Sequence, residues 1–148
     1  GFYNCAFMAN NDAQSPTHGL KIGKASGLTI DGCHWGGASA TDFNHGIEIT
    51  GTHFHNCEVK NSHITGVESG VEIAAGCVNA WMSWFKENYI GTGLSACAIG
   101  VNDAATTGHI CYCGNYVRAT NPNVLVNDHA GRWIGNIVAD AFEAGAAS

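Results

Sequence analysis

Ile47-Glu48-Ile49 belongs to a set of five short triplets that recur along this 148-residue chain. Each triplet has apolar residues at its first and third positions. This two-residue alternation predicts a short β-strand whose first and third side chains point into a core. Successive triplets begin 27, 24, 28 and 25 residues apart, and a period in the twenties is typical of a solenoid with stacked coils. The triplets are Leu20-Lys21-Ile22, Ile47-Glu48-Ile49, Val71-Glu72-Ile73, Ile99-Gly100-Val101 and Val124-Leu125-Val126.

A second element, an Asn or Gly followed by a short β-like stretch, recurs in step with the triplets. Asn and Gly tolerate left-handed backbone geometry, so this element predicts a sharp corner between two strands. Asn side chains that stack at such a corner are expected to hydrogen-bond from coil to coil. The copies are Asn4-Cys5-Ala6-Phe7, Gly32-Cys33-His34-Trp35, Asn56-Cys57-Glu58-Val59, Asn88-Tyr89-Ile90, Asn115-Tyr116-Val117 and Asn136-Ile137-Val138.

A third strand-like segment lies between these two elements, for example Leu28-Thr29-Ile30 and Arg132-Trp133-Ile134. Three short strands per coil predict an all-β chain, a parallel β-helix of about six coils with 21–32 residues each. We expect the β-helix to occupy residues 1–139, and residues 140–148 to form a short cap or tail, because this Ala-rich stretch is too short for a stable lone helix. The chain begins at Gly1 in the middle of a coil, which predicts a piece of a longer protein.

Three features carry a resemblance to a known group of proteins. They are the repeated Gly-Asn-Tyr/Ile-Val and Asn-Cys elements, the stretch 101–108, and the Ala-rich end after Asn136. On these features the chain resembles right-handed, single-stranded parallel β-helix repeat proteins, and more narrowly the β-helical structural proteins of tailed phages and uncultivated viruses. The resemblance covers nearly the whole chain. It implies a virion component, such as a spike, fibre or capsid-surface protein, assembled in the host cytoplasm.

Composition excludes several classes of function. Charged residues make up only 12% of the chain and apolar residues 45%, which argues against intrinsic disorder. The net charge is −6 and the six cations do not cluster, so a nucleic-acid partner is not expected. No apolar run approaches 18 residues, so we expect no membrane span.

Seven cysteines, an odd number, disfavour a closed disulfide framework. Cys5, Cys33 and Cys57 follow the corner element in three successive coils, so we expect a column of buried thiols and assembly in a reducing compartment. No cofactor is expected. The weak metal candidates are His53 and His55, two imidazoles on one face of a strand with Phe54 on the other.

Glu48 and Glu72 are the candidate catalytic carboxylates. Each is the outward, middle residue of its triplet, and adjacent coils place the two backbones about 4.8 Å apart. A retaining glycosidase needs carboxyl groups about 5–5.5 Å apart, so the spacing permits this chemistry. The alternative is a solvated outer strand in which Lys21 pairs with Glu48. The next members of this column are expected to be Gly100 and Leu125, so no acidic groove continues.

Trp81, Trp84 and Phe85 fall in the longest segment between two corner elements. They either pack over the core or form an exposed platform that binds carbohydrate. Further along, the outward position after the corner becomes apolar, at Ile90, Val117 and Val138. An outward apolar strip needs a cover, so we expect these three residues to form the interface of a homotrimer, the usual state of phage β-helix proteins.

Three functions remain open from the sequence. The first is a non-enzymatic structural or adhesion component of a virion, with itself, other virion proteins and a host-surface glycan as partners. The second is a polysaccharide-degrading tailspike depolymerase, a glycoside hydrolase or lyase, with Glu48 and Glu72 as its catalytic pair. The third is a carbohydrate-binding β-helix module that uses Trp81 and Trp84.

Overall fold

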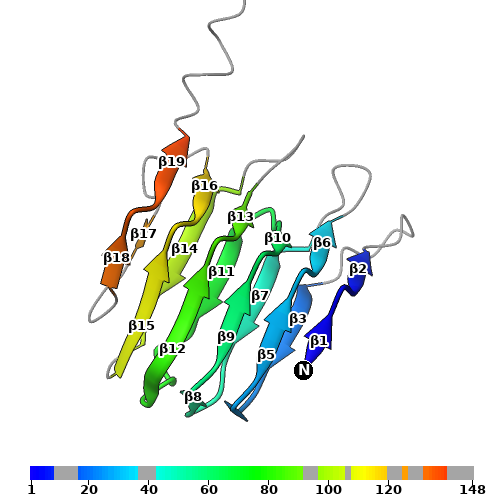
Figure 1. Cartoon of the computed structure of the whole chain (residues 1–148). Helices are drawn as coiled ribbons and strands as arrows, with labels where there is room; N and C mark the ends of the chain where they lie inside the picture. The colour runs from blue at the N-terminus through cyan, green and yellow to red at the C-terminus, as the bar shows by residue number, and fades with distance from the viewer. Residues whose placement is uncertain are drawn as a thin grey trace, which may run out of the picture.

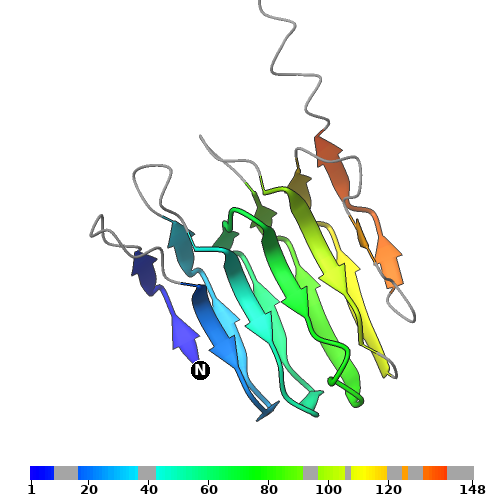
Figure 2. The same ribbon diagram turned by 180° about the vertical axis from the view of Figure 1, so that it is seen from behind.

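The computed structural model describes residues 1–8, 17–36, 43–91, 97–105, 108–119, 125–126 and 132–139. Within these ranges the regular secondary structure is β-strand. The strands form three long parallel sheets and one two-stranded sheet, and the long sheets wrap around a common interior (Figures 1 and 2). No helix of the described residues has the length and hydropathy of a membrane span.

The chain visits the three long sheets in turn, and each strand pairs with its counterparts from the preceding and following coils. This path confirms the predicted all-β parallel solenoid. Sheet A contains β1 (Phe2–Tyr3), β5 (Thr29–Asp31), β9 (Glu58–Lys60), β12 (Ala80–Lys86), β15 (Gly108–Cys113) and β18 (Arg132–Ile134). Sheet B contains β2 (Ala6–Met8), β6 (His34–Gly36), β10 (His63–Ile64), β13 (Tyr89–Ile90), β16 (Tyr116–Arg118) and β19 (Ile137–Ala139).

Sheet C holds the recurring triplets. Its strands are β3 (His18–Ile22), β7 (His45–Ile49), β11 (Ser69–Ile73), β14 (Ile99–Asp103) and β17 (Leu125–Val126). A short sheet of β4 (Ala25–Ser26) and β8 (Phe54–His55) lies at the corner between sheets C and A. The right-handed winding stays a prediction, and the expected cap at 140–148 lies outside the described residues.

The first three triplets align in sheet C as predicted. Leu20, Ile47 and Val71 share one inward column, and Lys21, Glu48 and Glu72 share the outward column beside it. The fourth and fifth predicted triplets were out of register. Val71 pairs with Val101, which lies 30 residues along the chain, and Val101 pairs with Leu125.

A glycine column explains the register error at the fourth triplet. Gly46 precedes the inward Ile47, and Gly100 precedes the inward Val101 in the same way. A Cβ on Gly46 would lie 2.7 Å from the Ile64 side chain and from the Gly70 carbonyl oxygen, so this position needs glycine. Ile99-Gly100-Val101 therefore imitates a triplet by alternation alone, while Asn102 and not Gly100 follows Glu72 in the outward column.

The interior consists of stacked apolar columns, one or more from each sheet. Large rings pack against one another in the interior: the Phe85 and Tyr112 ring centres of sheet A lie 5.5 Å apart, and the Phe54 ring of β8 lies 6.1 Å from that of Phe85. Burying each such ring contributes about 1.5–3 kcal/mol, so this interior is the main source of stability. The inward columns include Ile30, Val59, Phe85 and Tyr112 of sheet A, Trp35, Ile64, Ile90 and Val117 of sheet B, and Ile47, Val71 and Val101 of sheet C.

The predicted Asn ladder lies at the corner between sheets A and B. Asn115 Oδ1 accepts hydrogen bonds from the backbone N–H of Asn88 (3.0 Å) and from its side-chain amide (3.0 Å). Asn136 Oδ1 accepts the equivalent pair from Asn115, both at 2.8 Å. Ser62 continues the ladder one coil earlier, where its backbone N–H donates to Asn88 Oδ1 (3.1 Å) and its Oγ accepts from the backbone N–H of Cys33 (3.1 Å). The ladder is confirmed at Asn88, Asn115 and Asn136, with Ser62 one coil earlier, whereas Asn4 and Asn56 of the predicted copies are not among its rungs.

The predicted column of three thiols was wrong at its third member. Ser62 follows Cys33 in this corner column, whereas Cys57 lies at the other corner, just before β9. There its backbone N–H donates to Ser83 Oγ at 3.2 Å. Asn56-Cys57 resembles the corner element between sheets A and B, because both corners of the coil need a residue with positive φ. The φ is 49° at Asn61, in the corner between sheets A and B, and 52° at Asn56, in the corner before β9.

The predicted alignment of Asn88-Tyr89 with Gly32-Cys33 was also wrong by one residue, because Tyr89 shares the column of His34 and not of Cys33. This shift reversed the predicted orientation of the apolar strip. Ile90 and Val117 are fully buried in the core, and their neighbours Tyr89 and Tyr116 point outward instead. Val138 pairs with Val117 but is 44% exposed, because β19 is the last strand described in sheet B. The predicted outward strip of Ile90, Val117 and Val138 therefore does not exist.

Candidate functional site

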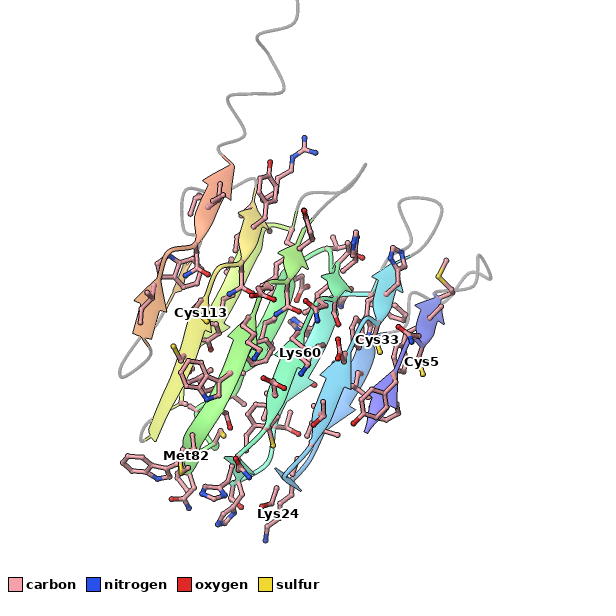
Figure 3. All side chains as sticks on the ribbon, in the orientation of Figure 1. Cys5, Lys24, Cys33, Lys60, Met82 and Cys113 are labelled. Carbon is pink, nitrogen blue, oxygen red and sulfur yellow. The ribbon has the colours of Figure 1, made fainter. Side chains whose placement is uncertain are left out.

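The outer face of sheet A carries tryptophan and ion-paired side chains. Trp84 points outward from β12, 45% exposed, between Glu58 of β9 and Cys111 of β15. Trp81 is the second residue of the same strand and is 44% exposed. Figure 3 shows Lys60 and Cys113 over this sheet, with Met82 at its lower corner. Of the two alternatives from the sequence, packing over the core or exposure, the two tryptophans show exposure.

Phe85 was wrongly grouped with the two tryptophans. It is fully buried in the inward column, where it pairs with Val59 and Tyr112. Adjacent residues of a strand point to opposite faces, so Trp84 and Phe85 cannot share a surface. Met82, with a φ of 55°, lies at a register shift between Ala80 and Ser83, and this irregularity separates Trp81 from the regular alternation.

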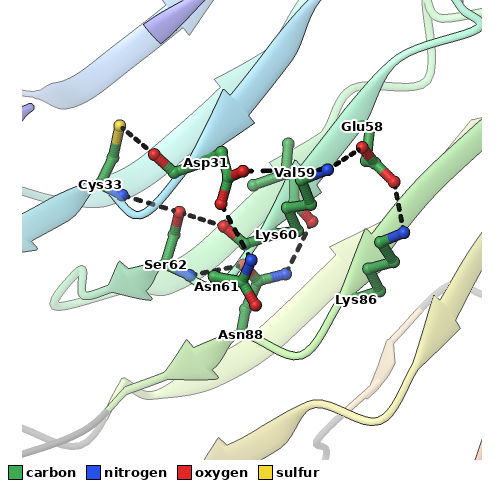
Figure 4. Close-up of polar contacts among 9 residues, drawn as sticks. All are labelled: Asp31, Cys33, Glu58, Val59, Lys60, Asn61, Ser62, Lys86 and Asn88. Carbon is green, nitrogen blue, oxygen red and sulfur yellow. Dashed lines mark hydrogen bonds and ion pairs between the residues drawn. The ribbon is translucent and has the colours of Figure 1, made fainter. Parts of the chain in front are cut away.

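Four charged residues form a network beside Trp84 (Figure 4). Glu58 Oε2 lies 2.7 Å from Lys60 Nζ, and Glu58 Oε1 lies 2.5 Å from Lys86 Nζ. Lys60 Nζ also lies 3.8 Å from Asp31 Oδ2, and Asp31 Oδ1 accepts a hydrogen bond of 2.9 Å from the Asn61 side-chain amide. These groups come from three consecutive strands of sheet A, so the network connects three coils.

The ion pairs shift the titration of two members of this network. Hydrogen bonds from Lys60 and Lys86 lower the pKa of Glu58 below its ordinary value. The hydrogen bond to Glu58 raises the pKa of Lys60 above its ordinary value. Both groups are therefore charged across the neutral range.

Glu48 and Glu72 lie on adjacent strands of sheet C, directly opposite each other in the register. Glu48 Oε2 lies 3.3 Å from Lys21 Nζ, the pair expected from the sequence, and 2.8 Å from His18 Nδ1. The contact between His18 and Glu48 does not have the geometry of a hydrogen bond. It is an ion pair when the imidazole is protonated.

Both oxygens of Glu72 accept hydrogen bonds. Ser69 Oγ donates to Oε2 at 3.1 Å, and Asn102 Nδ2 donates to Oε1 at 2.8 Å. Because the single Ser69 hydroxyl proton goes to Glu72, His45 Nδ1 must be the donor in its 2.7 Å contact with Ser69 Oγ. A glycosidase pair needs one carboxyl that donates a proton, whereas Glu48 and Glu72 both face hydrogen-bond donors or cations.

The sequence analysis missed the polar partners of these two carboxylates. His18, His45 and Ser69 occupy one column of sheet C, each two residues before an inward apolar position. The His18 and His45 rings stack with their centres 5.8 Å apart. The recurring His/Ser-Gly pair before the first three triplets is the signal that was available in the sequence.

A second missed feature is a column of stacked rings on the outside of sheet B. The rings of His34 and His63 lie 5.5 Å apart, those of His63 and Tyr89 lie 5.0 Å apart, and those of Tyr89 and Tyr116 lie 5.7 Å apart. The His63 and Tyr89 rings are stacked, whereas the rings of the other two pairs are tilted by 37° and 38°.

His53 and His55 flank the buried Phe54 and lie on the opposite face of the strand from it, as the alternation predicted. His53 contacts Thr52 Oγ1 at 2.7 Å through Nδ1 and Asn79 Nδ2 at 3.2 Å through Nε2, so both of its ring nitrogens are engaged by protein groups. Across the described ranges, no three His, Cys, Asp or Glu side chains are grouped as a metal site. The role of His53 and His55 as metal ligands stays a prediction.

None of the seven cysteines forms a disulfide, and five of them are buried. Burial raises the pKa of Cys57 and of Cys77 above the ordinary thiol value. The buried thiols therefore fill space in the interior and at the corners.

The comparisons with known proteins are negative: no protein-family model, no curated protein and no solved structure matches this chain. The fold is thus established by the structure, and the link to viruses remains an expectation from the sequence.

Proposed function

We propose that this chain is a non-enzymatic structural or adhesion component of a virion, a rigid β-solenoid that displays binding surfaces on its outer faces. The observation that carries the proposal is the corner ladder from Cys33 through Ser62, Asn88 and Asn115 to Asn136. The side chain of each rung satisfies buried backbone groups of the preceding coil, which connects successive coils along the axis. Such a rod suits a load-bearing or surface-presenting role.

The outer faces support the same proposal. Three of their carboxylates are held by neighbouring side chains: Glu58 by two lysines, Glu48 by Lys21, and Glu72 by Ser69 and Asn102. Paired groups of this kind hold a surface in a fixed shape, which favours recognition over reaction.

Mass spectrometry of virus particles, purified from material that contains the gene, tests the proposal. Peptides of this chain are expected in the particle fraction, in a constant ratio to other particle proteins. Recovery of the chain only from cellular fractions that lack particles would contradict it.

Assembly as a homotrimer is a further part of the proposal, and it now lacks the support of the apolar strip. Light scattering coupled to size-exclusion chromatography, at micromolar concentration, measures the mass directly. A trimer has three times the 15.4 kDa of one chain, and a monomeric mass would remove this part of the proposal.

Polysaccharide cleavage is the second candidate function, because Glu48 and Glu72 are directly opposite on adjacent strands. Incubation with bacterial capsular polysaccharides and alginate-like polymers, followed by measurement of reducing ends or unsaturated products, tests it. Turnover that Glu48→Gln abolishes would establish the depolymerase, and no turnover across a broad panel would exclude it for those polymers.

A further inference from the structure

We propose that the outer face of sheet A around Trp84 binds a neutral, pyranose-containing glycan. The inference rests on the proposed adhesion function and adds to it the binding face and the class of ligand. The Trp84 ring supplies the apolar contact, and the network of Asp31, Glu58, Lys60 and Lys86 supplies the polar contacts.

Trp84 is suited to the apolar contact by its position. Its neighbours in the outward column are Glu58 and Cys111, and no stacked ring partner of Trp84 occurs among the described residues. One face of a pyranose ring carries mainly C–H groups, and an indole offers a broad apolar surface on which that face can lie. The tyrosines and histidines outside sheet B differ, because each of these rings lies beside another ring, with ring centres 5.0–5.7 Å apart.

The charged network has hydrogen-bonding capacity left for sugar hydroxyls. A carboxylate has about four acceptor positions and an ammonium group three donors. Glu58 accepts from two lysines, so about two of its acceptor positions remain, and Lys86 contacts a single carboxylate oxygen among the described residues. A hydroxyl group can donate to Glu58 and accept from Lys86, whose side chains are 27% and 34% exposed.

The balance of charge selects a neutral ligand. The network contains two carboxylates and two ammonium groups, and each ammonium already lies against a carboxylate. An acidic sugar would bring a third carboxylate beside Glu58 without an unpaired cation in the network to receive it, which is unfavourable. A neutral glycan satisfies the network without breaking an ion pair.

Native affinity electrophoresis of the whole chain tests the inference, with dextran and mannan as neutral polymers and alginate and polygalacturonate as acidic ones. At least one neutral polymer is expected to retard the chain. Trp84→Ala is expected to weaken that retardation by about tenfold in apparent Kd, and Glu58→Gln by a smaller factor. Tyr89→Ala, which removes a similarly exposed ring from sheet B, serves as the matched control and is expected to bind as the wild type does.

The outcomes separate this inference from the proposed function. Retardation by acidic polymers alone, by no polymer, or equally in wild type and Trp84→Ala overturns the glycan site. A labelled chain that co-sediments with bacterial cells regardless of Trp84 would leave the adhesion function standing. Failure of the chain both to co-sediment with cells and to occur in virus particles would overturn the proposed function itself. Matching thermal melts of the variants and the wild type show that each variant is folded.

Discussion

Asn115 shows how a single side chain connects neighbouring coils. Its amide oxygen accepts from Asn88, and its amide nitrogen donates to the Phe85 carbonyl oxygen (2.9 Å) and to Asn136 Oδ1 (2.8 Å). The residue is buried, so water cannot replace these partners without opening the corner. Gly114, with a φ of 63°, provides the left-handed turn that aims Asn115 inward.

Asn115→Ala is expected to destabilise the fold, because it leaves the buried backbone N–H of Asn88 and the carbonyl of Phe85 without these partners. Each buried unsatisfied group costs about 1–3 kcal/mol. Denaturant unfolding measures the loss, with Asn79→Ala as the control because the Asn79 side chain makes one contact, to His53, at a half-buried position. Equal stability of the two variants would contradict a role of the ladder in stability.

Glu58 is expected to make the free energy of unfolding depend on pH in the acidic range. Because its pKa is lowered in the folded state, the unfolded chain takes up a proton at a higher pH than the folded chain. The stabilisation is present above the ordinary carboxyl pKa of about 4.3 and is lost as the pH falls through the lower folded value. Denaturant unfolding gives the free energy of unfolding at pH 7 and near pH 3. The difference between these two values is expected to be smaller for Glu58→Gln than for the wild type. Glu87→Gln, at an exposed carboxylate, is the control and should keep the full difference.

The cysteines should react with alkylating agents in an order set by burial. Burial raises the pKa of Cys57 and Cys77, so little thiolate is present in the folded protein at neutral pH. Iodoacetamide at pH 7.5 is expected to modify the half-buried Cys5 and Cys113 first, as peptide mass spectrometry can follow. In denaturant all seven should react at similar rates, and rapid labelling of native Cys57 would contradict the buried position.

At the scale of the elements, the glycine column of sheet C sets how closely the sheets approach. Gly46 lies against Ile64 of sheet B and the backbone of Gly70, with no room for a side chain. Gly46→Ala is therefore expected to overpack the interior and to cost about 1–3 kcal/mol. Gly23→Ala is the matched control, because a Cβ there meets no atom within 4 Å. Thermal unfolding compares the two, and equal melting temperatures would show that sheets B and C can separate at no cost.

The sequence predicted the elements best where the apolar alternation was unambiguous. Leu20, Ile47 and Val71 were placed in their correct column because each is flanked by a clear outward residue. The prediction failed at Ile99, since a glycine between two apolar residues fits either register. It failed again at Cys57, since both corners of the coil use the same left-handed residue type.

The candidate sites were harder to predict than the strands. Glu48 and Glu72 were placed side by side correctly, because their column follows directly from the repeat. The partners of Glu58 were not foreseen, because Lys86 approaches it diagonally from the next strand. Side-chain contacts of this kind depend on the register of two coils at once, which the local sequence does not encode.

At the scale of the whole molecule, the account rests on parallel coils in which residues about 21 to 30 positions apart are neighbours. Backbone NOE contacts in solution NMR test this most directly, for Glu48 with Glu72 and for Asn88 with Asn115. The solenoid is expected to give both sets of contacts, with the Hα-to-amide pattern of parallel strands. Close Hα-to-Hα contacts of antiparallel pairs, or no contact between these residues, would contradict it.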